Sequence, residues 1–350
     1  MAKVRIGFVG VGGMGQMAHL RNYVTIDDCQ VVAIAELRQE TGRLVATRYG
    51  VPKVYADHRQ MLAAEQLDGV VASQPFSRHA VLLPDLYRAA KHVFTEKPLA
   101  VSVEAGEKLA KQAAEAKCVH MVGYHKRSDP ATMYARKVID EWRQTKRMGA
   151  MKYVRILMPA GDWITSGFVG LLNAGDKAPP LEHEPRPAGM DEATAREYVS
   201  FVNYYIHQVN LMRHLLGEPY KVTYAEPSGV LMAVRSASGV AGAIEMTPYR
   251  TTIEWEESAL IAFEKGYIEL RLPAPLAMHR CGTVEIYADP GDGQTPQRTF
   301  PTMPWVHAMR QQAINFVKVC KGEMPPPCDA AEAVQDLGLA REYIRMRSGA

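Results

Sequence analysis

The sequence contains few cysteines and arranges none of them as a metal or redox motif. Its five cysteines include no C-x-x-C pair, and their odd number suits reduced thiols better than a disulfide framework. A zinc site therefore has little support, and we expect no bound metal. No apolar run reaches the length of a membrane span. The cysteines are Cys29, Cys118, Cys281, Cys320 and Cys328.

Blocks of like charge are also missing. The formal net charge is +3, and the basic residues are scattered among acidic ones, so we expect no nucleic-acid partner. Residues 1–9 imitate the start of a secretory signal, but glycines interrupt the apolar part and no small-residue cleavage site follows. The sequence therefore predicts a soluble, cytoplasmic protein. Its 350 residues, 47% of them hydrophobic, are enough for two domains that each have a core.

A glycine-rich turn follows the first predicted strand. Residues 4–9 predict this strand, a G-x-G-x-x-G pattern begins directly after it, and a helix-like stretch follows to Arg21. In that context the glycines permit a tight turn, let the backbone approach a pyrophosphate and allow close packing of the helix. The alternative is a glycine-rich turn that binds no nucleotide. The turn residues expected to hold a dinucleotide are Gly10, Gly12, Gly13, Met14 and Gly15.

An acidic residue ends the second predicted strand. Residues 30–35 form this strand, and Glu36 follows at about the interval at which dinucleotide-binding folds place the acid that contacts the adenosine ribose. A carboxylate there accepts hydrogen bonds from the ribose hydroxyls and repels a 2′-phosphate, which favours NAD over NADP. Arg38, two residues later, could instead reach such a phosphate, so NADP stays possible.

Strands and helices alternate through the rest of the first half, which predicts a right-handed, doubly wound parallel sheet. Ser102 is the expected N-cap of one helix. Ser73, Gln74 and Pro75 end a buried strand, and His79 opens the helix that follows. The predicted elements are helix 40–49, a strand around Val54, strand 68–72, helix 79–90, the strand that begins at 92, helix 103–117 and strand 119–123.

The strand that begins at His92 ends in Glu96, Lys97 and Pro98. Proline has no backbone N–H and a fixed φ, so the strand cannot continue past Lys97. In an open parallel sheet the carboxyl ends of the strands face the ligand crevice, so the Lys97 amine is placed where a substrate can meet it. The alternative is an ordinary solvated charge at the end of a strand.

The second half changes character from Met151 onward. Its short strands follow one another without intervening helices, which predicts a mostly antiparallel sheet that is open on one face. We therefore expect domains at 1–123 and 124–350, with the boundary in or near 123–149, and final helices that return to brace the first domain. The predicted elements are helix 131–142, strands 151–158, 221–226, 230–236, 240–246, 259–263, 267–272 and 284–287, and helices 305–319 and 330–346.

Candidate substrate contacts in this half lie on a loop and a helix. Residues 159–197 form a long Pro- and Gly-rich segment, which we interpret as the wall of a substrate pocket with Asp162 and Trp163 near its start. A single helix is predicted over 198–216, so that Asn203 and His207, four residues apart, would share one face. Packing is an equal alternative for Trp163, and a hydrogen-bonded core histidine is the alternative for His207.

Taken together and in order, these motifs resemble the glucose-fructose oxidoreductase/inositol dehydrogenase/MocA family. They are the glycine turn, the Ser73-Gln74-Pro75 turn with His79, Glu96-Lys97-Pro98, and the run from Gly123 to Pro130. The resemblance implies an NAD-binding Rossmann domain, a smaller α+β domain and a homo-oligomer, dimer or tetramer, formed through the open sheet. It also implies a cis peptide bond before Pro98.

The resemblance further implies roles for individual residues. Lys97 and His207 are the expected catalytic pair, and Ser73, Gln74 and His79 are expected to contact the cofactor. Glu96 alternates to the opposite side of its strand from Lys97, so we expect it at the nicotinamide ribose. The family places an Asp where this chain has Asn203, and an amide cannot carry the negative charge. This replacement leaves open whether a proton passes through that position. The expected substrate contacts are His125, Lys126, Asp162, Trp163, Asn203, His207 and Tyr249, although a solvated basic loop and core packing remain alternatives for His125, Lys126 and Tyr249.

The expected chemistry is hydride transfer between nicotinamide and a secondary hydroxyl, or the matching ketone, of a sugar, glycoside or cyclitol. Lysine has an ordinary pKa of about 10.4, so Lys97 would need burial or a nearby positive charge to act as the base. His207 would hold the same hydroxyl and share its proton. An NAD-dependent glycosidase that oxidises its substrate transiently is the alternative, and a non-catalytic NAD-binding sensor is a further one.

Overall fold

The computed structural model describes residues 2–291 and 293–349, which form two compact units. The first contains residues 2–124, 166–191 and 309–337, and the second contains 125–165, the described residues of 192–308, and 338–349. The sequence suggested one boundary and final helices that return to the first domain, and the structure places both 309–337 and 166–191 in the unit that begins the chain. One of them, 166–191, lies inside the loop that we interpreted as a pocket wall.

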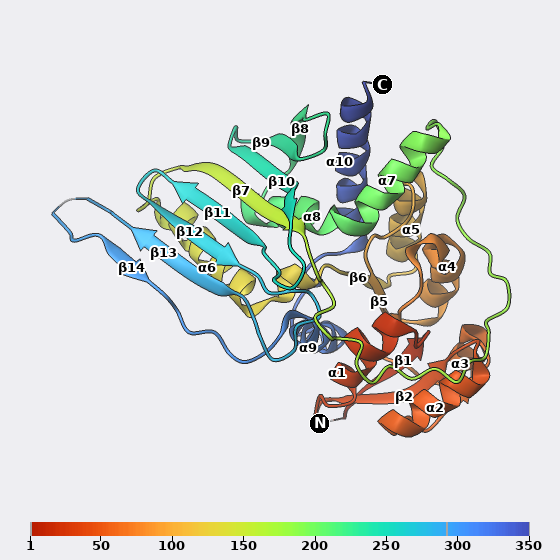
Figure 1. Cartoon of the computed structure of the whole chain (residues 1–350). Coiled ribbons are helices and arrows are strands. Elements are labelled where there is room, and N and C mark those ends of the chain that lie inside the picture. The colour runs from red at the N-terminus through yellow and green to blue at the C-terminus, as the bar shows by residue number, and fades with distance from the viewer. Residues whose placement is uncertain (1, 292, 350) are drawn as a thin grey trace. The chain divides into compact units, whose positions relative to one another are not determined.

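The first unit contains a six-stranded parallel sheet with the strand order β3-β2-β1-β4-β5-β6. Because all six strands are parallel, their carboxyl ends lie at one edge, and the strand order reverses between β1 and β4, which is where such folds bind their ligands. This arrangement confirms the predicted doubly wound sheet (Figure 1). The strands are β1 (Val4–Val9), β2 (Cys29–Ala35), β3 (Val54–Tyr55), β4 (Gly69–Ala72), β5 (His92–Glu96) and β6 (Val119–Gly123).

Local capping interactions set the ends of two helices in the first unit. Ser102 accepts a hydrogen bond from Ala105 N and caps α5, as predicted, and Gly50 ends α2 with a φ of +67°. Phe316 of α9 packs against Phe94 and Tyr23, so a helix from the end of the chain completes this core. The helices are η1 (Gly15–Leu20), α1 (Arg21–Tyr23), α2 (Gln39–Tyr49), α3 (His58–Ala64), η2 (Phe76–Arg78), α4 (His79–Ala89), α5 (Val103–Glu115) and α9 (Ala308–Cys320).

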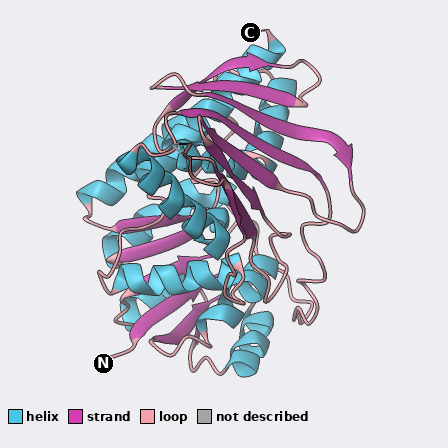
Figure 2. Ribbon diagram, turned by 90° about the vertical axis from the view of Figure 1, so that its left-hand side faces the viewer, coloured by secondary structure: helices cyan, strands magenta, loops and turns pink. Residues whose placement is uncertain are grey.

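The second unit contains an eight-stranded sheet with the order β14-β13-β12-β11-β7-β10-β9-β8. Only β10 and β7 pair in parallel, which confirms a mostly antiparallel sheet, and β14 is an additional strand that the sequence did not indicate. Figure 2 shows these strands as one broad layer. They are β7 (Met151–Ala160), β8 (Tyr220–Ala225), β9 (Leu231–Ser236), β10 (Ala241–Arg250), β11 (Ser258–Phe263), β12 (Gly266–Arg271), β13 (Thr283–Ala288) and β14 (Gln297–Thr299).

Helices α6 and α8 lie against one face of this sheet (Figure 1). Val154, Ile156 and Met158 of β7 are buried on that side, whereas Tyr153 and Leu157, which alternate with them, are only half-buried. The remaining helices are η3 (His125–Ser128), α6 (Pro130–Thr145), α7 (Glu192–Tyr204), α8 (Ile206–Leu216) and α10 (Ala330–Ser348), the last of which contributes residues to both units.

The single helix predicted over 198–216 is wrong. The helical chain begins earlier, at Glu192, and breaks at Tyr205, which separates α7 from α8. The Tyr205 hydroxyl is hydrogen-bonded to that of Thr247, and its ring lies 5.0 Å from the Tyr204 ring. These contacts come partly from a distant strand, so the helical periodicity of the sequence could not reveal the break.

Candidate functional site

The glycine turn joins β1 to the helix that starts the first crossover, as the sequence predicted. Gly10 has a φ of +87°, and a Cβ there would lie 2.7 Å from Ser73 O, while a Cβ on Gly15 would lie 2.6 Å from Gly10 O. Only glycine fits these two positions. The nearest atom to a Cβ on Gly12 is the Arg38 guanidinium at 4.0 Å, so the main chain at Gly12 stays open to an approaching phosphate.

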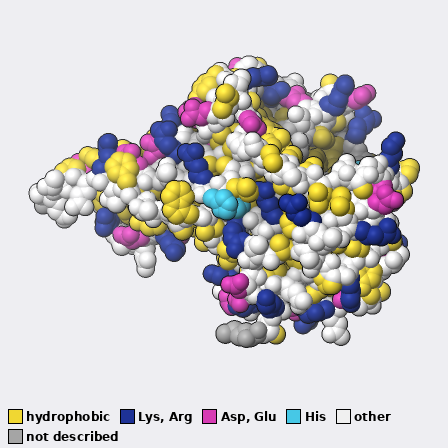
Figure 3. Space-filling model, turned by 60° about the horizontal axis from the view of Figure 1, so that its bottom comes forward, with side chains coloured by type: hydrophobic (Ala, Val, Ile, Leu, Met, Phe, Trp, Pro, Cys, Tyr) yellow, Lys and Arg dark blue, Asp and Glu magenta, His cyan; other side chains and the backbone are white. Residues whose placement is uncertain are grey.

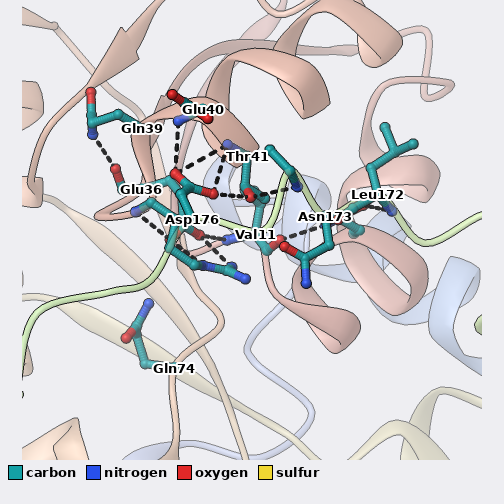
Figure 4. A network of polar contacts seen from close by, with 12 residues as sticks. Val11, Glu36, Gln39, Glu40, Thr41, Gln74, Leu172, Asn173 and Asp176 are labelled. Carbon is teal, nitrogen blue, oxygen red and sulfur yellow. Dashed lines mark hydrogen bonds and ion pairs between the residues drawn. The ribbon is translucent and has the colours of Figure 1, made fainter.

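Glu36 ends β2 and connects it to this turn. Its carboxylate accepts hydrogen bonds from Val11 N at 2.9 Å and from Arg38 N at 3.1 Å, and it is 6% exposed (Figure 4). The Arg38 side chain folds back onto the same carboxylate through Nε at 3.0 Å and Nη2 at 3.1 Å. The hydrogen bonds to Glu36 raise the pKa of Arg38 above its ordinary value, so Arg38 stays a cation. The acid thus lies beside the glycine turn and already holds the arginine.

The residues after β4 have a supporting geometry. Ser73 N donates to Val9 O at 3.0 Å, and Gln74 accepts from Arg78 Nη1 at 3.2 Å. His79 is completely buried, with Nδ1 3.0 Å from Leu99 O, and burial lowers its pKa to about 4. His79 is therefore neutral at physiological pH and contacts the chain just past Pro98. Cofactor contacts of these residues stay a prediction.

Lys97 directly follows β5, at the same edge of the sheet as the glycine turn. The Lys97–Pro98 bond is cis, which confirms the expectation taken from the family resemblance. The Lys97 side chain is partly exposed. Glu96 accepts from Lys97 N at 3.3 Å, and its other oxygen lies 2.7 Å from Nε2 of His19. Sequence reasoning missed His19, although its place four residues after Gly15 on the first helix was a usable signal.

In the second unit, the structure brings together His125 and His207. Their rings lie 4.6 Å apart in an edge-to-face arrangement, with His125 from η3 and His207 from α8. His125 is 4% exposed, while His207 is only partly buried. Asn203 lies on α7 and is exposed, so it does not share a face with His207 as the single helix required.

Lys126 lies in a buried ion pair instead of a solvated loop. Its side chain is 4% exposed and that of its partner Glu257 is 1% exposed. Glu257 also accepts from Gln208 Nε2 at 2.8 Å and from Trp255 Nε1 at 3.3 Å. Lys126, Gln208 and Trp255 thus all donate to the Glu257 carboxylate. Sequence reasoning missed Glu257 and Gln208, because nothing local marks a pair whose members are 131 residues apart.

The remaining candidates have partners within the second unit. Asp162 Oδ1 accepts from Ile164 N at 2.9 Å and Thr165 N at 3.1 Å, so its carboxylate holds a turn. Trp163 is half-buried, and its carbonyl accepts from Leu276 N. Tyr249 is 45% exposed and donates a hydrogen bond to Glu256. The substrate roles of all three stay predictions.

The surface carries no large field of one sign on the face drawn in Figure 3, where Lys and Arg side chains are interspersed with acidic and hydrophobic ones. Among residues 2–291 and 293–349, no group of three or more metal-ligating side chains is found. Within the same residues, no helix has the length and apolar character needed to cross a lipid bilayer.

Comparison with known proteins identifies related sequences for each part of the chain. Residues 4–124 match the family model described as "Oxidoreductase family, NAD-binding Rossmann fold". An inositol 2-dehydrogenase of Rhizobium meliloti is 25% identical over 356 residues, which cover 98% of this chain and 96% of that protein. A scyllo-inositol 2-dehydrogenase (NAD(+)) of Bacillus subtilis is 24% identical and covers 73% of this chain and 71% of its own length.

The fold has counterparts among solved structures. An oxidoreductase domain protein from Kribbella flavida superimposes with a TM-score of 0.74 at 19% identity, covering 100% of this chain and 98% of that one. At this identity the likeness shows the fold alone. It matches the combination of a doubly wound parallel sheet and a second, mostly antiparallel sheet.

Proposed function

Because the chain belongs to the glucose-fructose oxidoreductase/inositol dehydrogenase/MocA family of NAD-binding oxidoreductases, we propose that it oxidises a secondary hydroxyl of a sugar, glycoside or cyclitol, or reduces the matching ketone. The observation that carries this proposal is the carboxyl edge of the six-stranded sheet. The open glycine turn and the Glu36 carboxylate lie there at the ends of β1 and β2, and Lys97 follows β5 in the same sheet.

NAD, when bound, accepts the hydride that leaves the substrate carbon. The residues proposed to hold it are of three kinds: the main chain of the turn, the acid that meets the adenosine ribose, and the polar groups after β4 and β5. The open space beside the main chain at Gly12 and the buried carboxylate of Glu36 support this assignment. The proposed residues are Gly10, Gly12, Gly13, Met14, Gly15, Glu36, Arg38, Ser73, Gln74, His79, Glu96 and Lys97.

We assign Lys97 as the group that takes the hydroxyl proton in oxidation and returns it in reduction. His207 is proposed as the second catalytic group, which holds the same hydroxyl and shares its proton. The ring of His125 against that of His207 supports this assignment, because it restricts the orientation of the imidazole. His125, Lys126, Asp162, Trp163, Asn203 and Tyr249 are the further proposed substrate contacts.

The substrate class follows from the relatives. Two of them are named as inositol dehydrogenases, so a cyclitol is the first candidate, and sugars and glycosides carry the same secondary hydroxyl. Asn203 is exposed and neutral, so it can accept or donate a hydrogen bond to a hydroxyl but cannot store a proton. We therefore place the acid–base work on Lys97 and His207 alone.

We also propose that the two parts of the chain have different functions and that the protein forms a homo-oligomer. Residues 1–123 bind the cofactor, and 124–350 bind substrate and form a homo-oligomer through the outer face of the eight-stranded sheet. Half-buried Leu157, Leu260 and Ala262 lie on that face, opposite α6 and α8. Their partial exposure supports the proposal that this face packs against another subunit.

Five free thiols suit the reducing cytoplasm, which is the proposed location.

A substrate panel tests the function. The purified protein is incubated with NAD and a set of inositols, monosaccharides and glycosides, and the absorbance of reduced nicotinamide is followed. We expect reduction of NAD with at least one cyclitol or sugar, and loss of that signal in the Lys97→Ala variant. Absence of any response across the panel, in a protein that binds NAD, would contradict the proposed substrate class.

A further inference from the structure

Residues 166–191, here called the strap, belong to the first unit although the chain before and after them belongs to the second. The strap is the segment that precedes α7 in Figure 1. Near its end, Glu184 accepts hydrogen bonds from Val101 N at 3.1 Å and Ser102 N at 3.0 Å. His183 Nδ1 lies 2.8 Å from Ser77 Oγ. Polar contacts therefore hold this end of the strap to the first unit.

Near its start, the strap contacts the glycine turn. The Gln16 side chain donates to Leu172 O at 2.9 Å and accepts from Leu172 N at 3.0 Å, a two-way bond between a buried amide and the strap's main chain. The same Gln16 amide donates to Val11 O at 2.7 Å. The ring of Phe168 lies against Gly13, where a Cβ would meet it at 3.4 Å. These contacts place the strap beside the proposed pyrophosphate site.

Between these attachments, Asp176 caps helix α2 (Figure 4). Its carboxylate accepts from Glu40 N at 2.9 Å, from Thr41 N at 3.2 Å and from the Thr41 hydroxyl at 2.5 Å. Arg38 stands at the N-cap position of α2 but makes no side-chain capping bond. Asp176 therefore supplies, from 135 residues further along the chain, the acceptor that a local N-cap would normally provide.

This position matters because of what a dinucleotide presents there. In a doubly wound fold the acid at the end of β2 receives the adenosine ribose, and NADP places its 2′-phosphate beside that acid, toward an arginine and the start of the next helix. Here the arginine is held by Glu36, and the first amides of α2 are held by Asp176. Arg38 and the Glu40 and Thr41 amides, which a 2′-phosphate could use as donors, therefore already have anionic partners.

We propose that Asp176 is a specificity-determining residue, through which the strap makes the protein select NAD over NADP by placing a carboxylate where the 2′-phosphate would bind. This inference rests on the proposed function only in that the protein binds a nicotinamide dinucleotide. The Thr41 hydroxyl and the α2 amides lower the pKa of Asp176, so the carboxylate is ionised at neutral pH and repels a phosphate. Glu36 and Asp176 then act from two sides on one ribose position.

The test measures binding of NADH and NADPH separately, by titration calorimetry, in the unmodified chain and in Asp176→Asn. The amide keeps the size of the side chain but removes its charge and weakens the cap. We expect the Kd for NADPH to fall about tenfold, since removal of one charge near a doubly charged phosphate is worth that much at a solvated site, and the Kd for NADH to change by less than about twofold.

Two control variants separate charge from loosening of the strap. Thr41→Val removes the hydroxyl that Asp176 and Ala174 N both contact but leaves the carboxylate, so NADPH should bind no better than to the unmodified chain. Glu182→Gln removes a charge from the strap at a residue whose carbonyl accepts from Arg78, and it should also leave the NADPH Kd unchanged. Equal gains in all three variants would overturn the proposal.

Two further outcomes separate the proposed function from the role of Asp176. Failure of the unmodified chain to bind NADH would overturn the proposed function. Normal NADH binding together with an unchanged NADPH Kd in Asp176→Asn would overturn only the role of Asp176. Circular dichroism and a thermal melt of each variant show whether α2 remains folded. The Asp176→Ala variant, which removes all capping capacity, should weaken the fold more than Asp176→Asn while showing the same shift toward NADPH.

Discussion

The edge of the six-stranded sheet and the interior beneath the eight-stranded sheet both hold charged pairs, but they hold them differently. Arg38 and Glu36 lie two residues apart beside the glycine turn, and the Arg38 side chain is 23% exposed. Lys126 and Glu257 lie 131 residues apart, with side chains 4% and 1% exposed. The first pair is partly open to solvent and to a ligand, whereas the second is shielded from solvent.

This difference in burial sets how strongly each pair depends on its partner. A charge that stays partly exposed remains in contact with water, while a buried charge that loses its partner bears the full cost of its desolvation. The same contrast applies to the lysines. Lys97 follows the end of a strand and is partly exposed, and Lys126 is enclosed by Glu257 and the Trp255 ring.

The largest expected effect is at the sheet edge. In Lys97→Ala, turnover should fall by about 10²–10⁴-fold, because the general acid–base group is removed, while the Kd for NADH changes by less than about threefold. Steady-state kinetics on the best substrate of the panel and calorimetric titration of NADH measure the two quantities. Turnover retained at the original level would remove Lys97 from the mechanism. Lys126→Ala is the lysine variant to compare with Lys97→Ala. Its main effect should be a loss of stability.

The next effect tests the buried pair. In Glu257→Ala, the free energy of unfolding should fall by about 3–5 kcal/mol, because Lys126 is left as an uncompensated buried charge. Gln208 and Trp255 would lose their acceptor as well. Urea unfolding followed by circular dichroism measures the change.

Glu257→Gln serves as the control for that experiment, since it keeps an acceptor for Gln208 and Trp255 and removes only the charge. It should cost less than Glu257→Ala, and the difference isolates the hydrogen bonds. The double variant Lys126→Met/Glu257→Leu should recover part of the loss, because no buried charge remains. A cost below about 1 kcal/mol for Glu257→Ala would mean that water reaches the pair.

The sequence predicted the first of these regions far better than the second. The glycine turn, Glu36 and the strand end at Lys97 each depend on neighbours within a few residues, and their steric requirements appear in the residue types themselves. A Cβ on Gly10 or Gly15 would meet main-chain atoms, so only glycine can stand there. The doubly wound sheet followed from the alternation of strands and helices, because connections between parallel strands are short and right-handed.

The parts that could not be predicted depend on contacts between distant residues. Lys126, interpreted as a candidate polyol contact, forms an ion pair with Glu257. The sequence near either residue gives no indication of its partner. The break at Tyr205 and the position of the strap have the same origin. Asp176 sits in a polar, Gly-containing stretch, where a carboxylate carries no local sign that it will cap α2.

A smaller effect concerns pH, where the two units respond in opposite directions. In the first unit, burial lowers the pKa of His120 to about 3, and its ring nitrogens lie 2.8 Å from the Tyr87 hydroxyl and 2.9 Å from that of Thr95. The unfolded chain gains this proton near its ordinary pKa of about 6.5, so acid favours unfolding. His120 should therefore reduce stability as the pH falls from about 6.5 toward 3, by up to about 1.4 kcal/mol per pH unit.

In the second unit, burial raises the pKa of Asp129 to about 6, despite hydrogen bonds from Ala131 N and Gly282 N. The folded state then holds the proton more tightly than the unfolded one, so stability from Asp129 rises as the pH falls from about 6 to about 4. Urea titrations between about pH 4 and 6 measure the free energy of unfolding. Relative to the unmodified chain, this free energy should rise less with pH in His120→Gln and more in Asp129→Asn. Slopes that move in the same direction would contradict the assignment of opposite signs.

The smallest effect decides whether Asp162 belongs with the binding residues or with the structural ones. Its Oδ1 accepts from Ile164 N and Thr165 N, which is the bonding of a turn, and Thr165 has the strained φ of +44° that such bonds can hold. Asp162→Ala should therefore cost about 1 kcal/mol of stability, because the turn loses its acceptor. Asp162→Asn keeps that acceptor and should leave the stability unchanged, while KM rises because the proposed substrate contact uses the charged carboxylate. An unaltered KM together with an unaltered melting temperature in Asp162→Asn would instead restrict Asp162 to holding the turn.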